Sequence, residues 1–295
     1  MKLLNDIFSF KSIKKIILVS VILISSKYSI LCQQSVFLET DDGWKIHSKY
    51  VAPKKNLPVI MLVHSSKSNH TEWKKWFSEI ERYGYGWLAI DLRGHGVSTF
   101  KTDGSSQTFQ SFSISGFDND YNKMIRDIDA AVLYLSSSSI KEDRIFIMGI
   151  NLGANIAIKY AAINKNIAGV IAINPSINAN DILSINPLRL YGKRPILFVT
   201  GQNFKKRMQE VMLLYDITKK TTGKENTFII TEFAIKSADD VYKSTMYKIF
   251  NWIKNPKLPE VIEPSIILST NALETSSQTH SCPEYIILNT GDENE

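Results

Sequence analysis

Apolar and polar positions follow a strand-and-helix rhythm from about residue 35 onward. Residues 36–39 and 44–51 flank Asp41, Asp42 and Gly43, and this arrangement predicts a β-hairpin. Continuous apolar runs follow, and segments with helical spacing separate them. Because strands that alternate with helices form βαβ units, we expect a mostly parallel sheet of about eight strands covered by helices, an α/β fold.

The same pattern places the individual elements. The expected buried strands are 58–64, 86–92, 144–148, 169–173, 195–200 and 227–231. The expected helices are 71–82, 120–135, 154–163, 205–218 and 239–253. Only about twenty residues separate the strands 169–173 and 195–200, which predicts a loop-scale insertion and therefore a minimal cap.

The first 32 residues differ from the rest of the chain. Lysines at and before position 15 precede an apolar run at 16–24, and Ser25, Ser26 and Lys27 follow it. This order is typical of a signal peptide, and the run is shorter than the roughly 20 residues that a membrane span needs. We expect an exported protein, periplasmic, cell-surface or secreted, cleaved after Ser26 or Cys32. If the segment is not cleaved, or if Cys32 carries a lipid, it anchors the protein to a membrane.

Charge divides the chain into three parts. Residues 1–32 carry five lysines and one aspartate, whereas residues 256–295 form a Pro-, Ser- and acid-rich extension with one lysine and seven acids. The domain at 33–255 is therefore basic, although the whole chain has a formal charge of only +6. No cluster of basic residues with interleaved aromatics stands out, so we expect a solvated basic surface and no nucleic-acid partner.

The cysteines exclude two classes of protein. Only Cys32 and Cys282 are present, so the sequence predicts neither a disulfide framework nor a clustered metal motif. We expect no metal and no cofactor.

Three short motifs occur in order along the predicted strands. Residues 62–65 read Leu-Val-His-Ser, residues 91–98 read Asp-Leu-Arg-Gly-His-Gly-Val-Ser, and residues 149–153 read Gly-Ile-Asn-Leu-Gly. Together they resemble the α/β-hydrolase superfamily over about residues 35–255, and the most similar patterns are those of small-capped esterases, dienelactone-hydrolase-like proteins and serine aminopeptidases. The resemblance implies the α/β-hydrolase fold, with residues 149–153 as the nucleophile elbow.

The resemblance also implies where a Ser-Asp-His triad would stand. The elbow holds Asn151, the acid position after strand 195–200 holds Phe204, and our placement of the histidine position holds Lys236. A neutral carboxamide has no proton to lose and is a poor nucleophile, so we predict that these are vestigial triad positions and that no catalytic residue remains there. Deamidation of Asn151 to aspartate is a minor alternative. Of the five histidines, at positions 47, 64, 70, 95 and 280, only His280 follows the elbow, and it lies in the extension.

Other family features persist. The resemblance assigns an oxyanion-hole-like pair of backbone N–H groups to Leu152 and Ser66, although Ser65 replaces the usual glycine. His64, Ser65 and His95 are candidates for lining the pocket, while Asp91 and Arg93 are expected to tie their turn. A displaced Ser/His dyad among Ser65, Ser66, Ser68 and His70 is an alternative source of chemistry.

The sequence favours a non-catalytic protein over an enzyme. We interpret the chain as an exported pseudoenzyme that binds a small ligand or a protein partner above the carboxyl edge of the sheet. One alternative is an active serine-type hydrolase, acting on carboxylic esters or peptides through displaced residues. The other is an interaction module that acts through its C-terminal tail.

Overall fold

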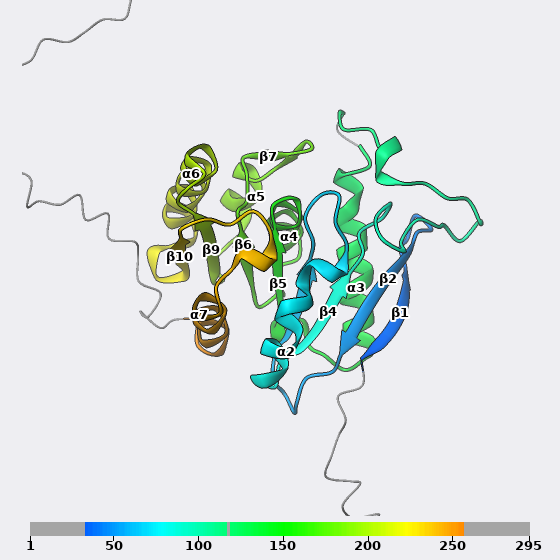
Figure 1. Cartoon of the computed structure of the whole chain (residues 1–295), viewed down its shortest axis with the longest axis horizontal. Helices are drawn as coiled ribbons and strands as arrows, with labels where there is room; N and C mark the ends of the chain where they lie inside the picture. Colours follow the sequence, from blue (N-terminus) through cyan, green and yellow to red (C-terminus); the bar gives the residue numbers. More distant parts are fainter. Residues whose placement is uncertain (1–32, 117–118, 257–295) are drawn as a thin grey trace, which may run out of the picture.

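The computed structural model describes residues 33–116 and 119–256 (Figure 1). The predicted signal peptide, residues 257–295 of the C-terminal extension, both cysteines and His280 lie outside the described residues. Within the described ranges, no helix combines the length and the apolar character needed to cross a membrane.

An eight-stranded sheet forms the centre of the molecule, in the order β1-β2-β4-β3-β5-β6-β9-β10. β2 runs antiparallel to both β1 and β4, and the remaining neighbours pair in parallel. The expected hairpin and the mostly parallel α/β sheet are therefore confirmed. The strands are β1 (Gln34–Glu39), β2 (Lys45–Val51), β3 (Val59–Val63), β4 (Gly86–Ile90), β5 (Ile145–Ile150), β6 (Gly169–Ile173), β9 (Ile196–Gly201) and β10 (Thr227–Glu232).

Helices cover both faces of the sheet. The side chains of β3 alternate between two apolar clusters, with Met61 in one and Leu62 in the other, because successive residues of a strand point to opposite faces. The first cluster includes side chains of α3 (Ile125–Ser137), α4 (Leu152–Ile163), α5 (Ile185–Leu190) and α6 (Lys205–Thr222), and the second those of α2 (Lys74–Arg82) and α7 (Lys243–Lys254). Each of the eight strands therefore contributes buried side chains to at least one of the two clusters.

The observed helices differ from the predicted ones mainly at their starts. The predicted helix 71–82 opens with a 3₁₀ turn, His70–Trp73, in which the Asn69 side chain accepts a hydrogen bond from the N–H of Thr71. The predicted helix 120–135 begins later, because the 3₁₀ turn Asn122–Met124 precedes α3. Similarly, the short turn Ala238–Asp240 comes before α7.

The insertion between β6 and β9 is more ordered than expected. It contains a hairpin of two short strands, β7 (Asn178–Ala179) and β8 (Ile182–Leu183), followed by α5. Asn180 and Asp181 at its tip both have positive φ, a conformation that these two residue types tolerate better than most. The segment is too short for apolar periodicity to reveal it.

Candidate functional site

Asn151 stands on a sharp turn between β5 and α4. Its backbone has φ 49° and ψ −113°, a strained conformation with positive φ that residues other than glycine resist. A Cβ on Gly149 would lie 2.2 Å from the carbonyl oxygen of Gly153, and a Cβ on Gly153 would lie 2.2 Å from that of Val63. The two glycines therefore let α4 pack directly on β3 and β5, which is the geometry of a nucleophile elbow.

The side chain of Asn151 is held at the top of this turn. Its Nδ2 donates a hydrogen bond of 3.0 Å to the carbonyl oxygen of Lys236, while its backbone N–H bonds to Ile173. A carboxamide lacks the ionisable hydroxyl that a histidine activates for acyl transfer. The group at the elbow is thus suited to hydrogen bonding.

The structure brings Asn151, Phe204 and Lys236 together. Phe204 lies between β9 and α6, and Lys236 lies in the loop that follows β10. The Lys236 ammonium is 5.5 Å from the centroid of the Phe204 ring, a cation–π arrangement. All three residues line one cavity of about 690 Å³ at the carboxyl edge of the sheet. The sequence-based alignment therefore identifies three neighbouring positions.

The floor of this cavity is fixed by two buried asparagines. Asn174, which follows β6, donates to the carbonyl oxygen of Ile235 at 2.7 Å and accepts from Thr200 Oγ1 at 3.0 Å. Asn155 on α4 exchanges hydrogen bonds with the backbone of Ser176. These contacts tie the ends of β6 and β9 to the loop after β10, so the cavity walls are held in place without a ligand.

The oxyanion-hole-like residues are placed at the start of α4 and in the loop after β3. Within the described residues, no acceptor bonds to the backbone N–H of Leu152 or of Ser66. The preceding Ser65 is held by Glu72, whose carboxylate accepts from its backbone N–H at 2.8 Å and from its Oγ at 2.9 Å. Among the described residues, no hydrogen bond joins His70 to Ser65, Ser66 or Ser68, and His70 Nδ1 bonds to Asp91 instead, so the displaced dyad stays a prediction.

His64 and His95 are buried beneath the loops and, among the described residues, neither belongs to the lining of the Asn151 cavity. His64 Nδ1 donates to the Ser65 carbonyl at 2.7 Å, and Nε2 accepts from the Leu92 N–H at 2.9 Å. Burial, reinforced by the neighbouring His95, lowers the pKa of His64 to about 3. His95 bonds to the Arg93 carbonyl and stacks on Phe109. Both rings support the turns around them.

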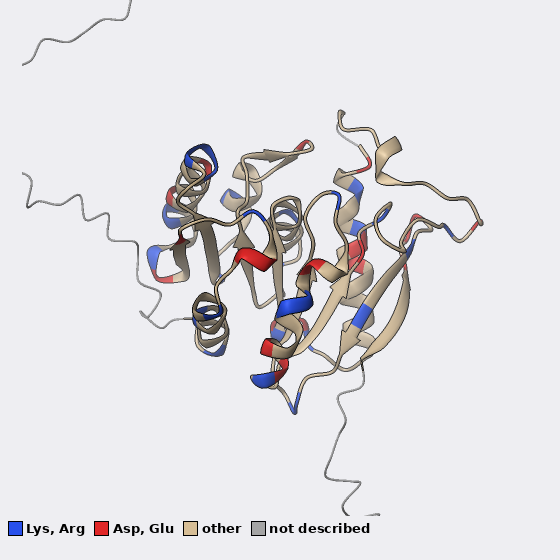
Figure 2. Ribbon diagram, in the orientation of Figure 1, with Lys and Arg blue, Asp and Glu red and all other residues tan. Residues whose placement is uncertain are grey.

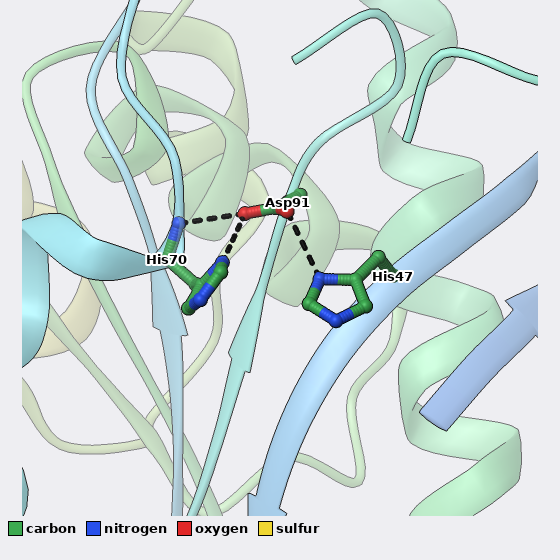
Figure 3. Close-up of side chains that lie close together, drawn as sticks. All are labelled: His47, His70 and Asp91. Carbon is green, nitrogen blue, oxygen red and sulfur yellow. Dashed lines mark hydrogen bonds and ion pairs between the residues drawn. The ribbon is translucent and has the colours of Figure 1, made fainter. Parts of the chain in front are cut away.

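Asp91 organises the turn after β4. Its two carboxylate oxygens accept hydrogen bonds from the Nδ1 atoms of His47 at 3.0 Å and His70 at 2.7 Å and from the backbone N–H of His70 (Figure 3). The backbone N–H of Val97 donates a fourth hydrogen bond to Asp91. Burial alone would raise the pKa of Asp91, but these hydrogen bonds lower it well below its usual range. The carboxylate therefore remains ionised and fully engaged.

Ligand atoms of His47, His70 and Asp91 all lie within 4.8 Å of one another. Imidazole and carboxylate groups suit a transition metal such as Zn²⁺, so these residues are the ones that could hold a metal in the described ranges. Both Nδ1 atoms are already bonded to Asp91, and a metal would have to replace those hydrogen bonds. The expectation of no metal site stays a prediction.

A second chain of polar contacts involves a residue that sequence analysis missed. Ser35 Oγ lies 2.9 Å from His47 Nε2, and His47 Nδ1 contacts Asp91, so the order serine, histidine, aspartate occurs here with hydrogen-bonding distances. Ser35 is exposed on the edge strand β1. The predicted hairpin contained the signal, because Phe37 opposite His47 places Ser35 diagonally across from it.

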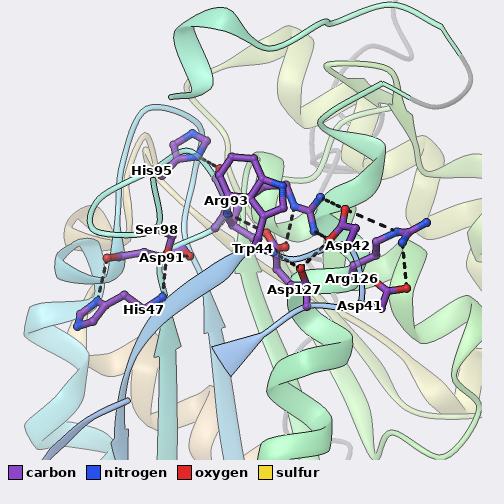
Figure 4. A network of polar contacts seen from close by, with 12 residues as sticks. Asp41, Asp42, Trp44, His47, Asp91, Arg93, His95, Ser98, Arg126 and Asp127 are labelled. Carbon is purple, nitrogen blue, oxygen red and sulfur yellow. Dashed lines mark hydrogen bonds and ion pairs between the residues drawn. The ribbon is translucent and has the colours of Figure 1, made fainter. Parts of the chain in front are cut away.

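Arg93, in the turn after β4, is almost completely buried (Figure 4). Its Nε bonds to Asp127 at 2.8 Å, and its terminal nitrogens form a bidentate pair with Asp42 at 2.6 and 3.0 Å. Burial alone would lower the pKa of Arg93, but the two carboxylates raise it. The motif 91–98 thus connects the β1–β2 hairpin, β4 and α3.

Solved structures share this architecture at low sequence identity. The esterase Pf2001 of Pyrococcus furiosus is 17% identical and aligns over 76% of this chain and 91% of its own, with a TM-score of 0.59. A hyperthermophilic esterase from Pyrobaculum calidifontis is 14% identical over 80% and 87%, with a TM-score of 0.56. A soluble variant of monoglyceride lipase from Saccharomyces cerevisiae is 13% identical over 78% and 97%, also with a TM-score of 0.56. This similarity shows the α/β-hydrolase fold alone.

A family comparison is more informative. No curated protein sequence matches the chain significantly. The family model for acetyl xylan esterase (AXE1) matches residues 25–264, most of the chain. The superfamily predicted from the motifs is therefore confirmed, and the chain belongs to the acetyl xylan esterase family within the α/β hydrolases.

Proposed function

We propose that this chain binds a small ligand in the Asn151 cavity without forming an acyl-enzyme there. The observation that supports this function is the residue at the elbow: Asn151 has the strained backbone of a nucleophile position, but its side chain is an amide bonded to Lys236. The other two positions hold an aromatic ring and a lysine, so no imidazole adjoins the elbow among the described residues. The cavity volume of about 690 Å³ is typical of small-molecule sites.

Ester turnover tests this proposal. Purified protein should hydrolyse chromogenic acetate esters no faster than a heat-denatured sample. Asn151→Ser alone should not restore useful turnover, because a serine without a general base is weakly nucleophilic near neutral pH. Adding Phe204→Asp and Lys236→His to that variant supplies the missing acid and base, so the triple variant should be the most active of the series. Brisk turnover by the single variant would contradict the proposal.

An active esterase is the second candidate, and it has support of its own. Membership of an esterase family favours it, and so does the hydrogen-bonded chain from Ser35 through His47 to Asp91. In this function Ser35 would be the nucleophile, with His47 as its base. Ser35→Ala should then abolish hydrolysis, while Ser65→Ala, which removes a hydroxyl bonded to Glu72, should leave it nearly unchanged. Equal activity in both variants would exclude Ser35.

We also propose that the protein is exported. The lysines before position 15 and the apolar run at 16–24 support it. N-terminal sequencing of the native protein should find a start after Ser26 or Cys32. A soluble cytosolic protein that begins at Met1 would contradict it.

A further inference from the structure

The charged residues that line the cavity beside Asn151 are mostly basic. Four basic side chains line it, Lys205, Lys206, Arg207 and Lys236, together with one acid, Glu210. Glu210 is bound to Arg207 at 2.9 Å, so this pair neutralises itself. Three positive charges are left facing a cavity of small-molecule size.

None of the three lysines forms an ion pair with a described residue. Burial raises the pKa of the nearby Asp240, but hydrogen bonds and the Lys236 charge lower it below its ordinary value. Within residues 33–116 and 119–256, no carboxylate lies within ion-pairing distance of the ammonium groups of Lys205, Lys206 or Lys236. The Asp240 carboxylate near Lys236 binds the backbone N–H groups of Lys236 and Ser237. The Lys236 ammonium lies over the Phe204 ring, on the cavity wall. Figure 2 shows basic residues at the start of α6 and in the loop after β10, the two segments that face each other here.

Two helices add to this positive field. α4 begins immediately after Asn151 and α6 immediately after Phe204, and both of these residues line the cavity. Neither helix has a side-chain cap or an acidic residue in its first turn. The start of a helix carries partial positive charge and normally attracts acidic side chains. In α6 the first turn instead holds Lys205, Lys206 and Arg207, an arrangement that opposes helix stability and that a bound anion would relieve.

We infer that the cavity binds a small organic anion, held by Lys205, Lys206 and Lys236 and oriented by the amide of Asn151. The negative group is a carboxylate, phosphate or sulfate ester, and the volume of about 690 Å³ fits a ligand of the size of a sugar. This inference rests on the proposed ligand-binding function and specifies the chemistry of its ligand.

Three sugars with the same ring but different charge test whether the affinity of the cavity depends on the charge of the ligand. Glucose, glucuronate and glucose 6-phosphate are titrated calorimetrically into the full-length protein at low and high salt. We expect both charged sugars to bind at least about tenfold more tightly than glucose. Each of the three lysines contributes a modest, solvent-screened attraction, and together these attractions account for the difference in affinity. Added salt should weaken the charged sugars and not glucose. A preference for one charged sugar identifies whether the site suits a carboxylate or a phosphate.

Two triple variants test whether the cavity lysines are the charges that bind the anion. Lys205→Gln/Lys206→Gln/Lys236→Gln should lose about tenfold in affinity for the charged sugars. Lys55→Gln/Lys220→Gln/Lys224→Gln removes the same charge from exposed lysines outside the cavity lining and should lose less than about twofold. Melting temperatures of both variants verify that they fold.

The contradicting outcomes are distinct from those of the proposed function. Equal affinity for all three sugars, no binding of either charged sugar, or equal losses in the two triple variants would overturn the anion inference. If glucose bound as tightly as the charged sugars, the anion inference would be wrong, but the proposed ligand-binding function would still stand. Ester turnover by the wild-type protein would overturn the non-catalytic function, and the charge preference would still be measured independently.

Discussion

Two motif regions at the same edge of the sheet differ in how many contacts hold their side chains. In the turn 91–98, Asp91 accepts four hydrogen bonds and Arg93 joins two carboxylates. Removing Asp91 would leave these donors without their acceptor, and removing Arg93 would leave the buried carboxylate of Asp127 without its partner. At the cavity, Asn151, Phe204 and Lys236 make only one side-chain hydrogen bond to each other's backbone and one cation–π contact. The residues of the turn therefore hold the fold, whereas we propose that Asn151, Phe204 and Lys236 bind a ligand in place of a triad. A fold can host different chemistries, so the activity of the chain has to be argued from the cavity and not from the turn.

We expect the largest loss of folding stability on substitution of Arg93. Arg93→Ala leaves Asp127, which is fully buried, without its partner, and breaking a buried ion pair from one side costs about 3–5 kcal/mol. The matched control is Arg126→Ala, whose pair with Asp41 is exposed and should contribute at most about 1 kcal/mol. Urea unfolding measures both. Equal losses would mean that the turn is no more important to the fold than the surface.

A smaller effect is expected at the elbow. Asn151→Val places a β-branched side chain at φ 49°, so it should destabilise the protein by about 1–3 kcal/mol. Asn151→Gly removes the strain together with one partly exposed hydrogen bond, and it should be nearly neutral. Melting temperatures distinguish the variants. If the valine variant melted with the wild type, residues 149–153 would not form an elbow.

The pH dependence gives the most gradual effect. Burial lowers the pKa of His64 to about 3 in the folded chain, against its ordinary value of 6.5 in the unfolded chain. Between these values only the unfolded state takes up the proton, so stability falls as pH decreases, by about 1.4 kcal/mol per pH unit. His64→Gln keeps an acceptor for the Leu92 N–H and cannot be protonated, so its stability should change less between about pH 6.5 and 5. Parallel curves for variant and wild type would contradict this role.

Much of the sheet could be predicted because buried strands leave long apolar runs. Strand 169–173 was located at its observed bounds, and the hairpin was indicated by Asp41, Asp42 and Gly43. Helix starts were less predictable, because turns such as His70–Trp73 depend on local hydrogen bonds from Asn69. The short hairpin formed by β7 and β8 has no periodicity to detect.

The candidate site was predicted in part. Asn151, Phe204 and Lys236 were located from motif order, and they meet in one cavity. Two features were missed: the contact of Ser35 with His47, which depends on strand register, and the lysines at the start of α6. Lys205 and Lys206 stood at the start of a predicted helix, but only the fold places them opposite Lys236.

Covalent labelling tests the central claim, that the elbow carries no nucleophile, most directly. The wild-type protein and the triple variant Asn151→Ser/Phe204→Asp/Lys236→His are incubated with a fluorophosphonate, and intact masses are measured. We expect no adduct on the wild-type protein and an adduct at position 151 of the triple variant. A stoichiometric adduct on the wild type would contradict it, and peptide mapping of that adduct to Ser35 would favour the esterase candidate.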